Sequence, residues 1–166
     1  MKARRIIFTS AAIAWMMLIF CMSAQNGPES SGLSDQICAL FGHLFVKGYD
    51  SWNAVRQAAF RESISFFVRK AAHMTEYAIL GILWLQALRA YGIRLRRSVL
   101  FSFLISAGYA ATDEAHQLLV AGRAGQIRDV VIDAAGAAIG IAAACIIIAV
   151  RKNHSSFVKK EKAENG

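Results

Sequence analysis

The amino-acid sequence predicts an all-α, polytopic integral membrane protein: a four-helix bundle with short amphipathic helices in the outer loop between spans one and two. Apolar residues make up 56% of the 166 residues and charged residues 18%, against roughly 45–50% and about 25% in ordinary globular chains. There is one proline, and the charges separate long apolar runs. The net charge of +8 therefore forms no nucleic-acid patch, and three scattered cysteines make no disulfide framework.

Four apolar stretches are long enough to cross a hydrocarbon core, which takes about 20 helical residues. They cover residues 6–23, 66–90, 98–120 and 129–150. Lipid does not tolerate unpaired backbone groups, and no alternating strand pattern competes with these runs. Residues 1–152 are thus predicted to form one transmembrane domain, and residues 153–166 a disordered cytoplasmic tail.

Basic residues predict the orientation, because cytoplasmic flanks hold the excess of lysine and arginine. With the N-terminus inside, 12 basic residues are cytoplasmic and 7 are outside, most of the latter in the long first loop. Both termini are therefore expected in the cytoplasm. A cleavable signal peptide also fits residues 1–23. A retained helix is favoured, because its removal would leave an odd number of spans.

The first loop contains two amphipathic segments. Residues 25–32 are typical of a turn, and Ser34 is a candidate N-cap for a helix whose apolar face runs from Leu33 to Phe45. A second run leads from Trp52 into the second span. Both are expected along the outer membrane surface, with aromatic rings at headgroup level; the alternative is that they pack on the bundle as a lid.

Polar residues gather at the outer end of the predicted spans. Arg69 and Lys70 fall at the outer boundary of the second span, and His73 and Glu76 lie one to two turns deeper. Helical spacing places Tyr77 on the same face. The third and fourth spans and the loop between them contribute a further set: Asp113, Glu114, His116, Gln117, Arg123, Arg128, Asp129 and Asp133.

These faces are predicted to converge on a pocket that opens outward. On the fourth span, Asp133 shares a face with Gly136 and Gly140, and small residues let helices approach closely. Ionisable groups in hydrocarbon cost several kcal/mol unless they are paired or hydrated. A purely structural salt-bridge network is the alternative, but buried ion pairs add little stability. A binding or catalytic site is therefore favoured.

The histidines suit two kinds of chemistry, metal binding and general acid–base catalysis. His73 with Glu76, and Asp113 with His116, are spaced three residues apart, as ligands are in some helical metal sites. The order of the two residue types differs between the pairs and no cysteine joins them, so neither metal nor cofactor is predicted. General acid–base catalysis is favoured over metal binding, because a histidine beside a carboxylate titrates near neutrality.

Two segments of the chain resemble the VanZ-like family. Residues 69–81, RKAAHMTEYAILG, resemble its first signature, and residues 113–133, from DEAHQ to RDVVID, its second. Ser23, Ala24 and Gln25 are similar to a short element at the end of the family's first helix. The family's usual proline before the loop glycine is replaced by Ala121.

The resemblance implies a small four-helix protein of the bacterial cell envelope. A member of the family is associated with low-level resistance to teicoplanin, a lipid-bearing glycopeptide antibiotic, but no reaction is implied. Two hypotheses follow. In one, the pocket binds a polar lipid headgroup or lipid-linked wall precursor, and lowers susceptibility to lipoglycopeptides. Its ligand-binding residues would be Arg69, Lys70, Tyr77, Glu114, Gln117, Arg123, Arg128, Asp129 and Asp133.

In the other hypothesis the protein is a membrane enzyme that acts on such a substrate. His73 and His116 would transfer protons, and Glu76 and Asp113 would tune them. Whether the chain is an enzyme, and its oligomeric state, are left open by the sequence.

Overall fold

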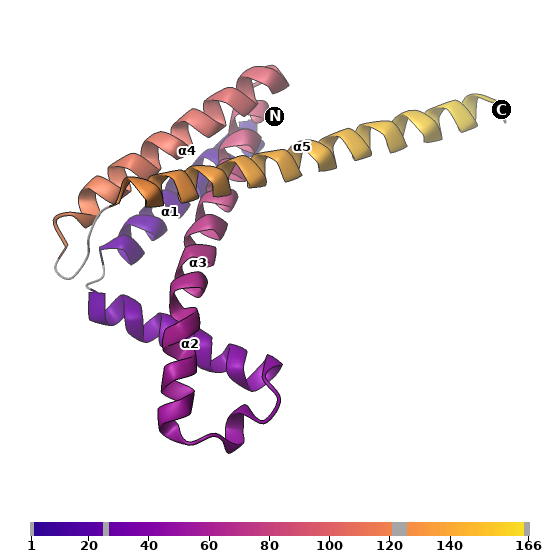
Figure 1. The fold of residues 1–166 in the computed structure, drawn as a ribbon. Helices are drawn as coiled ribbons and strands as arrows, with labels where there is room; N and C mark the ends of the chain where they lie inside the picture. Colours follow the sequence, from indigo (N-terminus) through magenta and orange to yellow (C-terminus); the bar gives the residue numbers. More distant parts are fainter. Residues whose placement is uncertain (1, 25–26, 121–125, 165–166) are drawn as a thin grey trace.

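A computed structural model describes residues 2–24, 27–120 and 126–164 of the chain, and these contain helices and no strand. The helices are α1 (Lys2–Ser23), α2 (Gly27–Phe45), α3 (Ala54–Ala90), α4 (Leu95–Gln117) and α5 (Ile127–Glu164), with a short 3₁₀ helix η1 (Tyr49–Ser51) between α2 and α3 (Figure 1). The predicted all-α class is confirmed.

Two regions are distinguished by their packing. In the first, called the bundle, α1, α4, the C-terminal part of α3 from Val68 and α5 up to Val150 lie together. The second region, called the arm, consists of α2, η1 and α3 up to Phe67. The long helix α3 belongs to both and joins them (Figure 1).

Close backbone contact between α3 and α5 holds the bundle together. A Cβ atom added at Gly140 would lie 2.7 Å from the Cα of Ala78, and one at Gly136 would lie 2.8 Å from the Cα of Met74. Only glycine allows this approach. The expectation that the face of Gly136 and Gly140 looks inward is confirmed, and Asp133 on the same face is 2% exposed.

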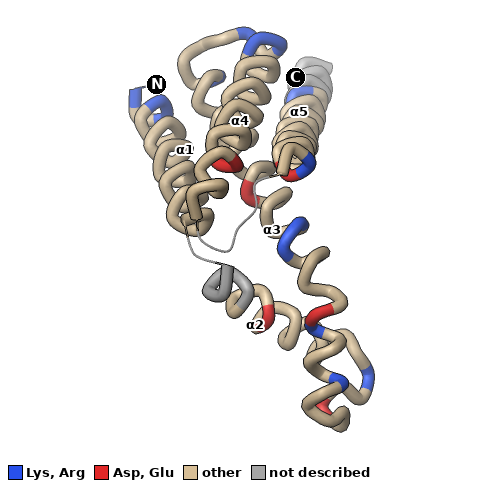
Figure 2. The backbone as a smooth tube through the Cα atoms, turned by 60° about the vertical axis from the view of Figure 1, so that its left-hand side comes forward, with Lys and Arg blue, Asp and Glu red and all other residues tan. Residues whose placement is uncertain are grey.

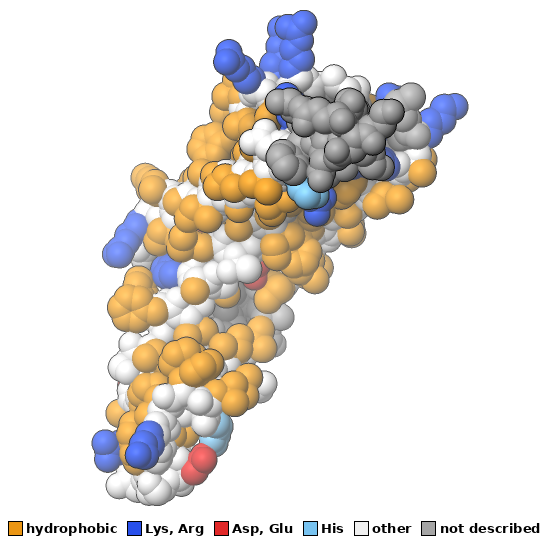
Figure 3. All heavy atoms as spheres, turned by 90° about the vertical axis from the view of Figure 1, so that its right-hand side faces the viewer, with side chains coloured by type: hydrophobic (Ala, Val, Ile, Leu, Met, Phe, Trp, Pro, Cys, Tyr) orange, Lys and Arg blue, Asp and Glu red, His pale blue; other side chains and the backbone are white. Residues whose placement is uncertain are grey.

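The bundle buries polar residues beside an apolar core that includes Tyr77, Leu80 and Leu85, and it exposes many large apolar side chains. Three serines of α4 (Ser98, Ser102 and Ser106) are fully buried. Large apolar side chains of the same helix, such as Leu100 and Leu104, are each 53% exposed. Hydrophobic side chains also cover much of the face shown in Figure 3. By length and composition, two described helical segments are apolar enough to cross a membrane, Lys2–Ser23 and Ile127–His154.

Charged residues gather at opposite ends of the bundle. The basic residues near the N-terminus and at the α3–α4 turn lie at one end, and the acidic residues of α3, α4 and α5 lie toward the other (Figure 2). At the basic end, the Arg5 Nε donates a hydrogen bond of 3.1 Å to the carbonyl oxygen of Ala90. This contact joins α1 to the C-terminus of α3.

Three helix boundaries differ from those predicted. Helix α2 begins at Gly27 and not at a Ser34 cap, because Pro28 is compatible with a first helical turn. The amphipathic run and the predicted second span form one continuous helix, α3, whose N-cap Asn53 accepts a hydrogen bond from the Arg56 N–H. Helix α5 continues to Glu164, through the segment whose composition predicts disorder; its lysine, glutamate and alanine residues favour helix.

Candidate functional site: a polar cavity at the acidic end of the bundle

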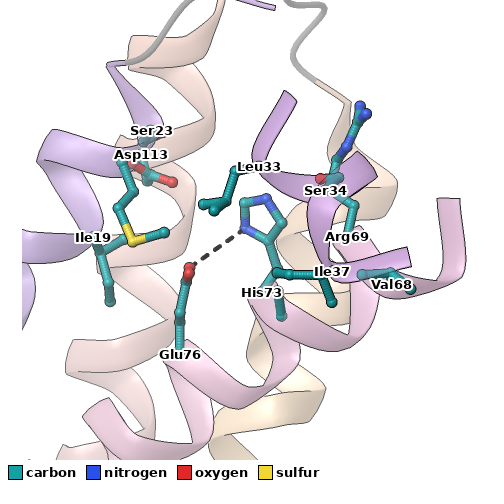
Figure 4. A pocket seen from close by; sticks show the side chains of 12 residues that line it. Ile19, Ser23, Leu33, Ser34, Ile37, Val68, Arg69, His73, Glu76 and Asp113 are labelled. Atoms are coloured by element: carbon teal, nitrogen blue, oxygen red, sulfur yellow. Dashed lines mark ion pairs between the residues drawn. The ribbon is translucent and has the colours of Figure 1, made fainter. Parts of the chain in front are cut away.

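A cavity of about 90 Å³ lies where the arm meets the acidic end of the bundle (Figure 4). Four helices border it, and half of its polar side chains come from α3. Its lining residues are Ile19, Met22 and Ser23 of α1, Leu33, Ser34 and Ile37 of α2, Val68, Arg69, Ala72, His73 and Glu76 of α3, and Asp113 of α4.

His73 lies between two carboxylates. Its Nδ1 is 3.9 Å from the Oε2 of Glu76 on the same helix (Figure 4). The same Nδ1 is 4.0 Å from the Oδ1 of Asp133 on α5. Asp133 is almost fully buried, and Glu76 and His73 are mostly buried. Two helices thus bring one imidazole and two acidic groups to one depth, as the helical spacing predicts.

Asp113 and Ser23, which line the cavity, each have a buried polar atom without a hydrogen-bond partner among the described residues. Asp113 is 3% exposed, and its Oδ2 accepts a 3.2 Å hydrogen bond from the Gln117 Nε2. Its Oδ1 and the Oγ of Ser23 have no hydrogen-bond partner among the described residues. A buried polar atom without a partner costs about 1–3 kcal/mol, so such atoms mark a place where a ligand or water completes the structure.

A second polar group lies at the edge of the cavity. The Nζ of Lys70 is 2.5 Å from the Oδ1 of Asp129, and Glu114 accepts a hydrogen bond from the backbone N–H of Gln126. The charged ends of Lys70 and Arg128 lie 5.5 and 5.8 Å from the ring centroid of Phe66. None of these six residues lines the cavity.

Arg69 lies at the boundary between the cavity and a second hollow. It borders both the cavity and a larger groove of about 360 Å³ on the arm. The groove is also lined by Gly32, Asp35, Ala58, Arg61, Glu62 and Ser65. Figure 4 shows Arg69 and Asp113 on opposite sides of His73. The Nε of Arg69 is buried and has no hydrogen-bond partner among the described residues.

Three predicted site residues lie elsewhere. The ring of His116 packs on that of Phe20, with centroids 4.5 Å apart, and His116 does not line the cavity. Tyr77 is completely buried in the bundle core, with its ring centroid 6.3 Å from that of Tyr109. Arg123 lies outside the described residues.

The geometry of the candidate metal ligands can be stated for the described residues. The described residues contain no group of three or more histidine, cysteine, aspartate or glutamate side chains placed to hold a metal ion. The two i, i+3 pairs noted in the sequence do not face each other, because His73 points to the cavity and His116 packs on α1.

Helix α2 contributes to the site. Leu33, Ser34 and Ile37 close one side of the cavity, which fits the alternative that this segment packs on the bundle as a lid. The apolar spacing of Leu33 and Ile37 indicated a packed face. It did not indicate the partner, since that depends on where the arm folds back.

Comparison with known proteins identifies a family for most of the chain. The model of the family described as VanZ/LLP1 matches residues 8–148, which confirms the resemblance noted in the sequence. No curated protein and no solved structure matches the chain.

Proposed function

The chain belongs to the VanZ/LLP1 family, and we propose that it is a four-span membrane protein whose cavity binds the polar headgroup of a lipid or lipid-linked wall precursor. In this proposal, α1, α4 and the bundle parts of α3 and α5 cross the membrane. The acidic end of the bundle faces outward, both termini are cytoplasmic, and occupancy of the cavity lowers susceptibility to lipophilic glycopeptides.

The surface of the bundle supports a membrane setting. Water-soluble monomers rarely expose continuous apolar patches above a few hundred Å². Here apolar side chains are exposed along α1, α4 and α5, including Ile6, Met17, Leu104, Ile139 and Ile146. The buried side of α4 consists instead of serines, alanine and acidic residues. Small and polar residues inside and large apolar residues outside are typical of helices that pack in lipid.

The charge distribution supports the orientation. Lys2, Arg4 and Arg5 begin α1, and the α3–α4 turn carries Arg94, Arg96 and Arg97 at the same end of the bundle (Figure 2). Cytoplasmic flanks are enriched in such residues. The acidic end and the arm then face outward.

The observation that supports binding is the set of unsatisfied polar atoms from three helices at one cavity. Ser23 Oγ from α1, Arg69 Nε from α3 and Asp113 Oδ1 from α4 are all buried without a described hydrogen-bond partner. A structural ion-pair network would satisfy these atoms internally. A ligand that supplies donors and acceptors together would satisfy all three.

Filling the cavity tests the proposal. Ser23→Leu places apolar atoms where the cavity now lies, and Ser63→Leu, on an exposed position of the arm, is the matched control. We expect the purified wild-type and Ser63→Leu proteins to retain lipid, and Ser23→Leu to lose it, as measured by mass spectrometry of extracted lipid. Cells with wild-type protein should survive more teicoplanin than cells with Ser23→Leu. Equal lipid retention in all three proteins would refute headgroup binding.

Labelling of introduced cysteines tests the topology. In a background with the native cysteines replaced by alanine, Asp50→Cys on the arm should react with a membrane-impermeant maleimide in intact cells. Arg94→Cys at the opposite end should react only after permeabilisation. Both positions are exposed in the structure, so the reverse pattern would invert the proposed orientation.

One observation favours the second candidate, a membrane enzyme. His73 lies about 4 Å from both Glu76 and Asp133, and a histidine so placed can hold and release a proton near neutral pH. An enzyme would change the lipid composition of cells, and His73→Asn would abolish the change. Lipid extracts that are identical with and without the protein would reject catalysis.

A further inference from the structure

We propose that the headgroup held by this site is a zwitterionic aminoethyl phosphate, as in phosphatidylethanolamine: the ammonium group occupies the cavity and the phosphate contacts Arg69. This proposal rests on the proposed lipid-binding function and specifies its ligand. It is argued from the charge, the size and the two-part shape of the site.

The cavity favours a cation. Its described lining includes the carboxylates of Glu76 and Asp113, and Asp133 lies 4.0 Å from the lining residue His73. Lys70, the nearest lysine on α3, is already paired with Asp129. The unpartnered Asp113 Oδ1 and Ser23 Oγ are both acceptors at 3% and 2% residue exposure. A primary ammonium group brings three N–H donors and a positive charge to these oxygens.

The cavity is small. Its volume of about 90 Å³ lies well below the roughly 300–1,000 Å³ of pockets for drug-sized ligands. It therefore suits a small polar group such as a primary ammonium better than a sugar. A trimethylated ammonium is larger and has no N–H donor, so the cavity should discriminate against it.

Arg69 supplies the complementary anion site beside the cavity. It is the described basic residue shared by the cavity and the 360 Å³ groove, and its buried Nε has no described hydrogen-bond partner. Guanidinium groups suit phosphate, because they present several N–H donors in one plane. In the groove, Arg61 is already bonded to Asp35 at 2.7 Å. The phosphate is therefore assigned to Arg69, and the groove accommodates the rest of the headgroup region.

Native mass spectrometry of the full-length protein in detergent tests the assignment with lipids of identical acyl chains. Equimolar phosphatidylethanolamine, its mono- and dimethyl derivatives, phosphatidylcholine and phosphatidylglycerol are offered together. Retention should fall stepwise with each methyl group. We expect about a tenfold preference for phosphatidylethanolamine over phosphatidylcholine, which is the size of effect of one charge-assisted hydrogen bond. This series needs no variant and is independent of any folding defect.

Two substitutions assign the two halves of the headgroup. Asp113→Asn should remove the preference for phosphatidylethanolamine over phosphatidylcholine, and Arg69→Gln should weaken retention of both. Asp50→Asn, an exposed carboxylate of the arm, is the matched control and should leave the preference unchanged. If Asp113→Asn keeps the full preference, the ammonium assignment is wrong.

The possible results separate this inference from the function on which it rests. If no lipid of any class is retained, headgroup binding itself fails. If lipids are retained without preference, or with phosphatidylglycerol preferred, only the aminoethyl assignment fails. Soluble phosphoethanolamine is offered in a parallel arm: weak competition supports a lipid source, and binding as tight as that of the lipid would overturn it.

Discussion

The bundle and the arm pack differently, although one helix, α3, runs through both. In the bundle, Gly136 and Gly140 touch the backbone of α3, and the fully buried residues include Ser102 and Ser106 as well as Tyr77 and Leu80. The arm encloses a large aromatic side chain, Tyr49, which is 1% exposed. Its ring centroid lies 5.0 Å from that of His43 and 5.5 Å from those of Trp52 and Phe60.

This contrast indicates what stabilises each region. In the proposed membrane setting, a helix pair gains nothing from burying more apolar area, and the bundle would depend on close backbone approach and van der Waals contact. The arm gains stability from removing aromatic surface from water. The candidate cavity lies at the junction, where polar groups of the bundle meet the apolar side of α2.

The largest effect is expected from adding one methyl group to the bundle. In Gly140→Ala, the new Cβ would lie 2.7 Å from the Cα of Ala78, and backbone on both sides leaves no side chain to move aside. Overpacking commonly lowers the free energy of unfolding by about 1–3 kcal/mol. For Gly140→Ala we expect a loss at the upper end of this range, or no folded protein. Thermal unfolding in detergent measures the change.

The control for this substitution is a glycine of the bundle helix α4. A Cβ added at Gly108 of α4 meets nothing within 4 Å, so Gly108→Ala should stabilise the helix by up to about 1 kcal/mol. Equal unfolding temperatures for the two variants would mean that close packing of α3 and α5 does not hold the bundle.

A smaller and more local effect is expected in the arm. Tyr49→Ala removes the ring around which His43, Trp52 and Phe60 are arranged, at a cost of about 3 kcal/mol by analogy with buried aromatic residues. Limited proteolysis should then cut residues 46–53 faster, while the bundle keeps its unfolding temperature. Tyr91→Ala, at an exposed position, should change neither. If Tyr49→Ala unfolds the bundle as well, the two regions are one cooperative unit.

The two regions also differ in how far the sequence predicts them. The inward faces of the bundle helices follow from helical spacing alone, because residues three or four apart lie on one face of a helix. Asp133, Gly136 and Gly140 of α5 are an example. The convergence of His73, Glu76, Asp113 and Asp133 at one depth follows in the same way. The structure of the arm does not follow from helical spacing. Helix α2 begins seven residues before its predicted cap. The packing of the arm depends on the buried Tyr49, which belongs to no periodic apolar pattern in the sequence.

Helical spacing predicts the turn of the helix on which a site residue lies better than the direction in which its side chain points. His116 occupies the right turn of α4, but its ring packs on Phe20 while Gln117 bonds Asp113. Adjacent residues of a helix point about 100° apart. A small rotation of the last turn of α4 therefore decides whether a side chain faces the cavity or a neighbouring helix. That rotation is set by tertiary packing, which spacing within one helix does not encode.

The smallest expected effect concerns the thiol of Cys38, which lies in the arm. Burial raises the pKa of this thiol, and the nearby Asp35 adds to the rise, so less of it is thiolate near neutral pH. Because the thiolate is the reactive form, Cys38 should react with N-ethylmaleimide at least about tenfold more slowly than a cysteine introduced at the exposed Gln36, two residues earlier in α2. Raising the pH should accelerate both reactions, and should leave Cys38 slower because its side chain is also shielded. Mass spectrometry of timed samples gives both rates. Comparable rates would show that α2 separates readily from α3, and the arm would then be a loosely attached helix and not a second packed region.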